Sequence, residues 1–176
     1  APFLLVINIV LPWGNAQAYM IREHRTSSGS DSEVLLQNTP SERLWNAFLL
    51  GNDDYRNERL KMIPRVTAGP WSIKKMVGST PIMIGQKTPV SYFGSKEENY
   101  LEICVDVTGS SKFSQSICSA VTSKASAVTL DVGFVIEGKN DQVELPERLL
   151  CLFRLHHISM ERVPTILQWR QKLEQR

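Results

Sequence analysis

The sequence is poor in cysteine, and its cysteines follow no familiar pattern. They are Cys104, Cys118 and Cys151, with no Cys-x-x-Cys pair among them. An odd number of widely spaced cysteines argues against a disulfide framework and against a zinc site. We therefore expect free thiols in a reducing cytoplasmic compartment, with no bound metal and no cofactor.

Long apolar runs and a strong excess of one charge are also missing. No stretch reaches the roughly 18 to 20 apolar residues that a membrane-spanning helix requires. The apolar run near the start lacks the basic leader and the small-residue cleavage site of a signal peptide. Lysine and arginine number 20 against 18 aspartates and glutamates. This balance argues against a nucleic-acid partner and predicts that any electrostatic partner meets a local basic patch.

Known catalytic motifs are absent as well. The sequence contains no GxSxG, HExxH, Walker or dinucleotide-binding motif. An enzyme would have to build its site from His156 and His157 beside Arg154, using carboxylates on neighbouring strands. The carboxylates available for this are Glu102, Asp106 and Asp131. An ion-pair network over a sheet explains the same residues more simply, so we expect no catalytic activity.

The chain does contain enough apolar material for one hydrophobic core. It has 176 residues, of which 42% are hydrophobic, and a chain of this size forms one sizeable core but little more. We therefore predict a single domain over residues 1–176. Because the sequence begins at Ala1 without a methionine and enters an apolar run at once, we expect it to be a piece of a longer protein.

The first half of the chain predicts a β-hairpin followed by helices. Residues 3–11 are apolar and β-branched, residues 12–15 are turn formers, and residues 17–22 can form the returning strand. The polar run 24–38 predicts a loop. Apolar spacing and capping residues predict helices over residues 40–50, 53–63 and 71–77, ended by Gly51, Pro64 and Gly78 respectively.

Alternation with a period of two predicts strands in the second half. These strands cover residues 82–85, 90–93, 100–107, 127–137 and 149–158. A helix begun at Pro146 is the alternative for the last of them. Ser110 and Ser111 can cap a helix that carries Phe113, and the apolar residues within 163–173 have helical spacing. The fold class predicted is α+β, an antiparallel sheet with helices packed on one face and a C-terminal amphipathic helix.

Several stretches carry a family resemblance. In chain order they are FLLVINIVLP, GNDDYRNERLKMIP, PWSIKKMVGSTPIMIGQK, NYLEICVDV followed by GSS, and LPERLLCLFRLHHI. This succession resembles the C-terminal domain of the plant Enhanced Disease Resistance 2 proteins and spans nearly the whole chain. In that family the domain commonly follows a pleckstrin-homology domain and a START lipid-transfer domain. The resemblance implies a cytosolic regulatory protein that works at intracellular or plasma membranes, but no settled activity for the domain itself.

The stretch 51–87 is the densest in basic side chains and favours binding to a membrane surface. Each near-surface positive charge gains roughly 1 kcal/mol from anionic lipids, and a tryptophan suits the interface. The predicted headgroup-binding residues are Arg56, Arg59, Lys61, Arg65, Trp71, Lys74, Lys75 and Lys87. Ordinary ion pairs on a solvated helix face are the alternative interpretation of these charges.

An internal apolar pocket and a protein partner are two further possibilities. The predicted pocket lining for an apolar lipid ligand is Val105, Phe113, Leu130 and Phe134, for which core packing is the alternative. A protein-interaction module would dock its partner on the same basic patch or on the C-terminal helix, in the latter case through Ile166, Leu167 and Trp169. Lipid association should weaken with salt and need anionic lipid, whereas apolar docking should respond little to salt. Of these functions we favour non-catalytic lipid or membrane association.

Overall fold

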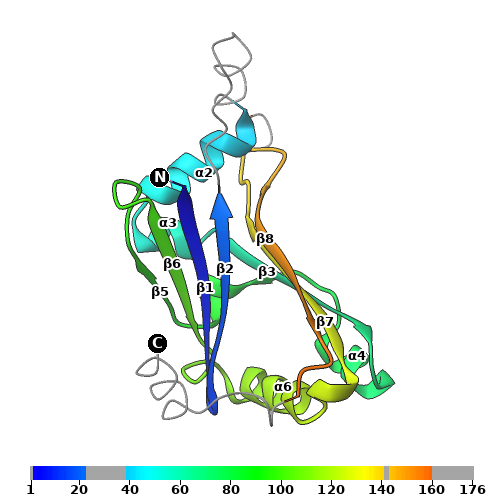
Figure 1. Cartoon of the computed structure of the whole chain (residues 1–176). Coiled ribbons are helices and arrows are strands. Elements are labelled where there is room, and N and C mark those ends of the chain that lie inside the picture. The colour runs from blue at the N-terminus through cyan, green and yellow to red at the C-terminus, as the bar shows by residue number, and fades with distance from the viewer. Residues whose placement is uncertain (1, 23–38, 141–142, 160–176) are drawn as a thin grey trace, which may run out of the picture.

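The computed structural model describes residues 2–22, 39–140 and 143–159, which form two four-stranded sheets and several short helices (Figure 1). The strand order is β2-β1-β6-β5 in the first sheet and β4-β3-β7-β8 in the second. The predicted α+β class is confirmed, but the strands form two sheets where we expected one. The helix expected at 163–173 and the loop expected at 24–38 lie outside the described residues.

The first sheet is built on the N-terminal hairpin. Strand β1 (Phe3–Leu11) pairs antiparallel with β2 (Gly14–Arg22) through a tight turn. On its other side β1 pairs in parallel with β6 (Tyr100–Asp106), which pairs antiparallel with β5 (Val90–Phe93). The hairpin and the two later strands confirm the sequence predictions. The parallel pair was not expected, because it joins segments that lie far apart in the chain.

The second sheet is antiparallel throughout. Strand β3 (Leu60–Ala68) lies between β4 (Ile82–Met83) and β7 (Thr129–Ile136), and β8 (Arg148–His156) forms the far edge beside β7. The segment after Pro146 is therefore a strand, and the helical alternative for it is excluded.

The helix expected from Asp53 to Pro64 was predicted wrongly, because only its first turn is helical. Helix α3 spans Asp53–Asn57, and the chain then enters β3. Proline is tolerated in β3 because β4 pairs only with Lys61 and Met62, so Pro64 lies where one side of the strand has no described partner. Pairing with β7 along nearly all of β3 outweighs the helical propensity of this segment.

The three longest helices lie at the two ends of the sheets, and not on one face as expected (Figure 1). Helix α2 (Pro40–Leu50) lies at one end, while α4 (Trp71–Val77) and α6 (Lys112–Ser123) lie at the other. These three helices confirm the sequence predictions. Helix α5 (Ile84–Lys87) replaces the second half of a predicted strand, and a 3₁₀ turn, η1 (Ala125–Ala127), precedes β7.

Both sheets and α2 share one hydrophobic core. Its fully buried members include Ile7, Leu101 and Ile103 from the first sheet, Leu60, Phe134 and Ile136 from the second, and Leu44 and Phe48 from α2. The alternation predicted for β6 is confirmed, since its odd-numbered residues are buried and its even-numbered residues are partly exposed. This core holds the two sheets together through their facing surfaces.

A second, smaller cluster fastens α4 to the rest of the molecule. Ile73 of α4 packs with Val66 of β3 and Val128, and side chains of α6 complete the contact. This cluster leaves the opposite side of α4 facing outward.

Candidate functional site

The predicted basic patch is divided by the structure, and Arg56 is its most buried member. Only 9% of this residue is exposed. Its Nε donates to the carbonyl of Phe48 at 3.0 Å and its Nη2 to the carbonyl of Leu49 at 2.9 Å, while Nη1 lies 3.3 Å from a carboxylate oxygen of Asp53. Arg56 thus satisfies the free carbonyls at the end of α2. Its assignment to a headgroup site is corrected, because its donors are already occupied inside the protein.

Arg59 and Lys61 are also engaged in internal contacts. The Arg59 guanidinium lies 3.9 Å from the centre of the Tyr55 ring and 3.6 Å from Glu144, and 12% of its side chain is exposed. Lys61 lies 2.7 Å from Glu147, with 14% of its side chain exposed. For both residues the structure favours the ion-pair interpretation over headgroup binding.

Arg65 and Lys87 are exposed, and Lys87 lies apart from the remaining patch residues. Arg65 lies on β3 opposite Asp131. Lys87 ends α5, which packs on α3 before the start of β3, whereas α4 follows the end of β3. A nine-residue strand separates these positions by roughly 26 Å. The eight predicted residues therefore do not form one surface.

Three of the predicted residues do lie together, on the outer face of α4. Trp71 is 73% exposed, and Lys74 and Lys75 are exposed on the same helix. A helix advances about 100° per residue, so Trp71 projects between the two lysines and away from the buried Ile73. The Lys75 ammonium lies 5.0 Å from the centre of the Trp71 ring. We call Trp71, Lys74 and Lys75 the α4 face.

The lysines of the α4 face have no acidic partner in the described part of the chain. Within residues 2–22, 39–140 and 143–159, neither Lys74 nor Lys75 forms an ion pair with an acidic side chain. Met76, also on α4, exposes 42% of its surface. The α4 face therefore combines free positive charge with an exposed aromatic ring beside a partly exposed thioether.

The residues considered for an enzyme do not assemble into one constellation. Asp131 and Arg154 pair across β7 and β8 with N–O distances of 2.6 and 2.8 Å, and the hydrogen bond and charge of this arginine lower the pKa of Asp131. His156 instead hydrogen-bonds Thr129 at 2.9 Å. The other two carboxylates belong to the first sheet. Among these residues, Asp131 and Arg154 thus form one ion pair across the two strands.

The four residues predicted to line an apolar pocket occupy different environments. Val105 and Phe134 are buried in the main core, and Leu130 is partly buried against both clusters. Phe113 is 73% exposed, because it opens α6 at a point where the helix has few neighbours from the sheets. These residues therefore do not surround a common cavity.

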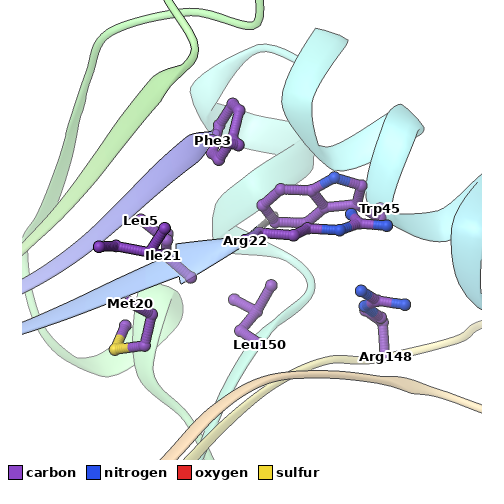
Figure 2. A pocket seen from close by; sticks show the side chains of 8 residues that line it. All are labelled: Phe3, Leu5, Met20, Ile21, Arg22, Trp45, Arg148 and Leu150. Atoms are coloured by element: carbon purple, nitrogen blue, oxygen red, sulfur yellow. The ribbon is translucent and has the colours of Figure 1, made fainter. Parts of the chain in front are cut away.

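A cavity that the sequence did not predict opens between the edge strands β2 and β8 (Figure 2). It has a volume of about 180 Å³. The residues that line it are Phe3, Leu5, Met20, Ile21, Arg22, Trp45, Arg148 and Leu150. Arg22 ends a strand that was predicted, and Arg148 directly precedes the predicted strand 149–158, but no local pattern indicates that the two residues meet.

Comparison with known families shows to which family this chain belongs. The family model described as Protein ENHANCED DISEASE RESISTANCE 2, C-terminal, matches residues 1–159. The chain belongs to this family. The resemblance seen in the sequence motifs is thereby confirmed.

A curated relative supports the assignment to the Enhanced Disease Resistance 2 C-terminal family. Protein ENHANCED DISEASE RESISTANCE 2-like of Arabidopsis thaliana is 35% identical over 117 residues, which is 66% of this chain and 16% of that protein. The chain thus corresponds to a small part of its relative's length. No solved structure matches this family domain significantly.

The described part of this family domain holds neither a membrane span nor a metal cluster. None of the helices in the described ranges is long and apolar enough to cross a bilayer. The same ranges contain no group of three or more histidine, cysteine, aspartate or glutamate side chains placed to hold a metal ion. Burial raises the pKa of the Cys151 thiol to about 11, so this thiol is protonated at neutral pH.

Proposed function

We propose that this Enhanced Disease Resistance 2 C-terminal domain associates with anionic membrane surfaces through the α4 face, as a non-catalytic, peripheral module on the cytoplasmic side. The observation that carries the proposal is the position of Trp71, 73% exposed between two lysines that have no acidic partner among the described residues. Tryptophan and lysine side by side suit the boundary between headgroups and water.

The energetics favour a weak and reversible association. Two lysines near an anionic surface contribute about 1 kcal/mol each, and partial burial of the Trp71 ring adds a term of similar size. Because α4 is held by Ile73 on its opposite side, the face is presented without unfolding of the helix. An interaction of this strength would cooperate with other parts of a longer protein.

The first test is a charge reversal on the α4 face. Lys74→Glu with Lys75→Glu should abolish binding to vesicles that contain phosphatidylserine, because it replaces attraction by repulsion at the contact. The thermal melt should change little, since both side chains are exposed. Co-sedimentation with vesicles at low and physiological salt measures the binding.

A matched control has the same change in net charge elsewhere. Lys87→Glu with Lys96→Glu alters two exposed lysines outside α4. This control should retain binding. Equal loss of binding in both double variants would show that net charge alone drives association, which contradicts the proposal. Binding that persists at high salt and without anionic lipid would point to apolar docking instead.

A further inference from the structure

We propose that the cavity between β2 and β8 binds a small amphipathic carboxylate. Its carboxylate group would bind the guanidinium groups of Arg22 and Arg148, and its apolar group would lie between the sheet edges. Trp45 of α2 lines the cavity, and Figure 1 shows α2 and α4 at opposite ends of the molecule. This inference is therefore independent of the proposed membrane contact.

The apolar part of the cavity is suited to a compact hydrocarbon group. Leu5, Met20 and Leu150 lie on one side of it, with the Phe3 ring beside the Trp45 indole (Figure 2). Its volume of about 180 Å³ exceeds the roughly 150 Å³ that accommodates a benzene ring in an engineered apolar cavity. A ring or a short alkyl segment would fit, and a longer chain would extend toward the open side.

Among the described residues, the polar part of the cavity carries one more positive charge than negative charge. Arg22 Nη2 lies 2.7 Å from both oxygens of Glu42, and Arg148 Nη1 lies 2.9 Å from one of them. Two guanidinium groups therefore share a single carboxylate. A monoanion placed beside them would restore neutrality, which favours a carboxylate over a dianionic phosphate.

Both guanidinium groups also have donors to spare. Each uses one terminal nitrogen for its bonds to Glu42, and its other two nitrogens form no hydrogen bond with a described residue. The side chains of Arg22 and Arg148 remain 40% and 24% exposed. The planar arrangement of these donors matches carboxylate geometry. Glu42 and the Trp45 ring, 5.5 Å from the Arg22 guanidinium carbon, hold the donors in place.

A titration with sodium octanoate tests this assignment. The methyl NMR signals of Met20, Leu5 and Leu150 monitor binding. We expect saturable shifts at these methyl groups and weaker binding of octanol, which lacks the charge. Arg148→Gln should weaken octanoate binding by about tenfold or more, because it removes charged hydrogen bonds, and should leave octanol binding unchanged.

Arg154→Gln is the matched control, since Arg154 lies on the same strand and is also ion-paired. It should bind octanoate as the wild-type protein does, and so should the Lys74→Glu/Lys75→Glu protein. Leu150→Trp should fill the cavity and exclude both ligands. If Leu150→Trp does not fold, the comparison of Arg148→Gln with Arg154→Gln still tests whether the cavity binds octanoate.

Three results would overturn the assignment. They are the absence of saturable shifts, equal affinity for octanol and octanoate, and unchanged octanoate affinity in Arg148→Gln. Loss of octanoate binding in the α4 double variant would also contradict the independence of the two sites. Failure of vesicle binding alone would overturn only the membrane proposal.

Discussion

Arg56 and Lys75 are basic residues on the same stretch of chain, yet their side chains serve opposite purposes. Arg56 turns inward and binds the carbonyls that end α2, whereas Lys75 lies outward beside Trp71. Arg56 turns inward because the carbonyls at the end of α2 lie close enough to accept hydrogen bonds from its guanidinium group. A count of positive charges along the sequence cannot reveal this, because it carries no information about which carbonyls lie within reach.

Arg56→Met should destabilise the protein without affecting its surface chemistry. It leaves two carbonyls of α2 without their charged donor, at a cost of about 3 kcal/mol. For a chain of this length we expect the melting temperature to fall by about 6–12 °C. Thermal unfolding followed by circular dichroism measures the change.

Arg65→Met provides the comparison for this prediction. Arg65 is exposed on β3, so its replacement should change stability by no more than about 0.5 kcal/mol. A similar loss of stability in both variants would mean that the contacts of Arg56 with α2 are not important. Vesicle binding at 25 °C should be unaffected in either protein.

At the scale of elements, α4, like α2, has the bounds that the sequence predicted. Pro70 and Gly78 fix its two ends, and the spacing of Ile73 and Val77 defines its buried side. The end of α3 was missed in contrast, since Leu60 to Val66 can satisfy either a helix or a strand pattern. Only the distant pairing with β7 decides between them.

The docking of α4 should depend on Ile73. Ile73→Ala removes a side chain that is 5% exposed in the small cluster, and we expect a loss near 2 kcal/mol. Because α4 contacts mainly β3 and α6, the helix should loosen locally. Amide hydrogen exchange should show faster exchange in α4 and unchanged protection in β1 and β6.

Ser72→Ala on the exposed side of α4 is the control and should leave exchange unchanged. Weaker vesicle binding should accompany the loosening in Ile73→Ala, because the α4 face is presented only by the docked helix. Uniform loss of protection across both sheets would show that the small cluster is part of a single cooperative unit, contrary to this expectation.

At the scale of the whole molecule, two sheets enclose one core. The cavity is lined by Trp45 of α2, and α2 and α4 lie at opposite ends of the molecule (Figure 1). Membrane contact through α4 therefore leaves the cavity between β2 and β8 free. A carboxylate held in that cavity would likewise not compete for the α4 face. The arrangement allows both sites to be occupied together.

The sequence predicted most elements of this architecture but not how they meet. Alternation in β6 identified its buried face correctly, since that pattern is local. In β7 the alternation did not identify a single buried face, because residues of both parities are buried from Val132 to Ile136. Two contacts join distant segments: the parallel pairing of β1 with β6 and the approach of Arg22 to Arg148. The sequence pattern within a segment does not indicate which distant segment packs beside it. For the same reason, the predicted basic patch contained residues from both ends of β3.

The most direct test of the membrane proposal is quenching of Trp71 fluorescence by lipids with brominated acyl chains. Vesicles of brominated phosphatidylcholine with phosphatidylserine should quench the wild-type protein and Trp13→Phe, which alters an exposed tryptophan in the β1–β2 turn. Trp71→Phe should show much less quenching, because the proposal places the Trp71 ring at the boundary between headgroups and water. Equal quenching of Trp71→Phe and wild type, or none in either, would contradict membrane association through α4.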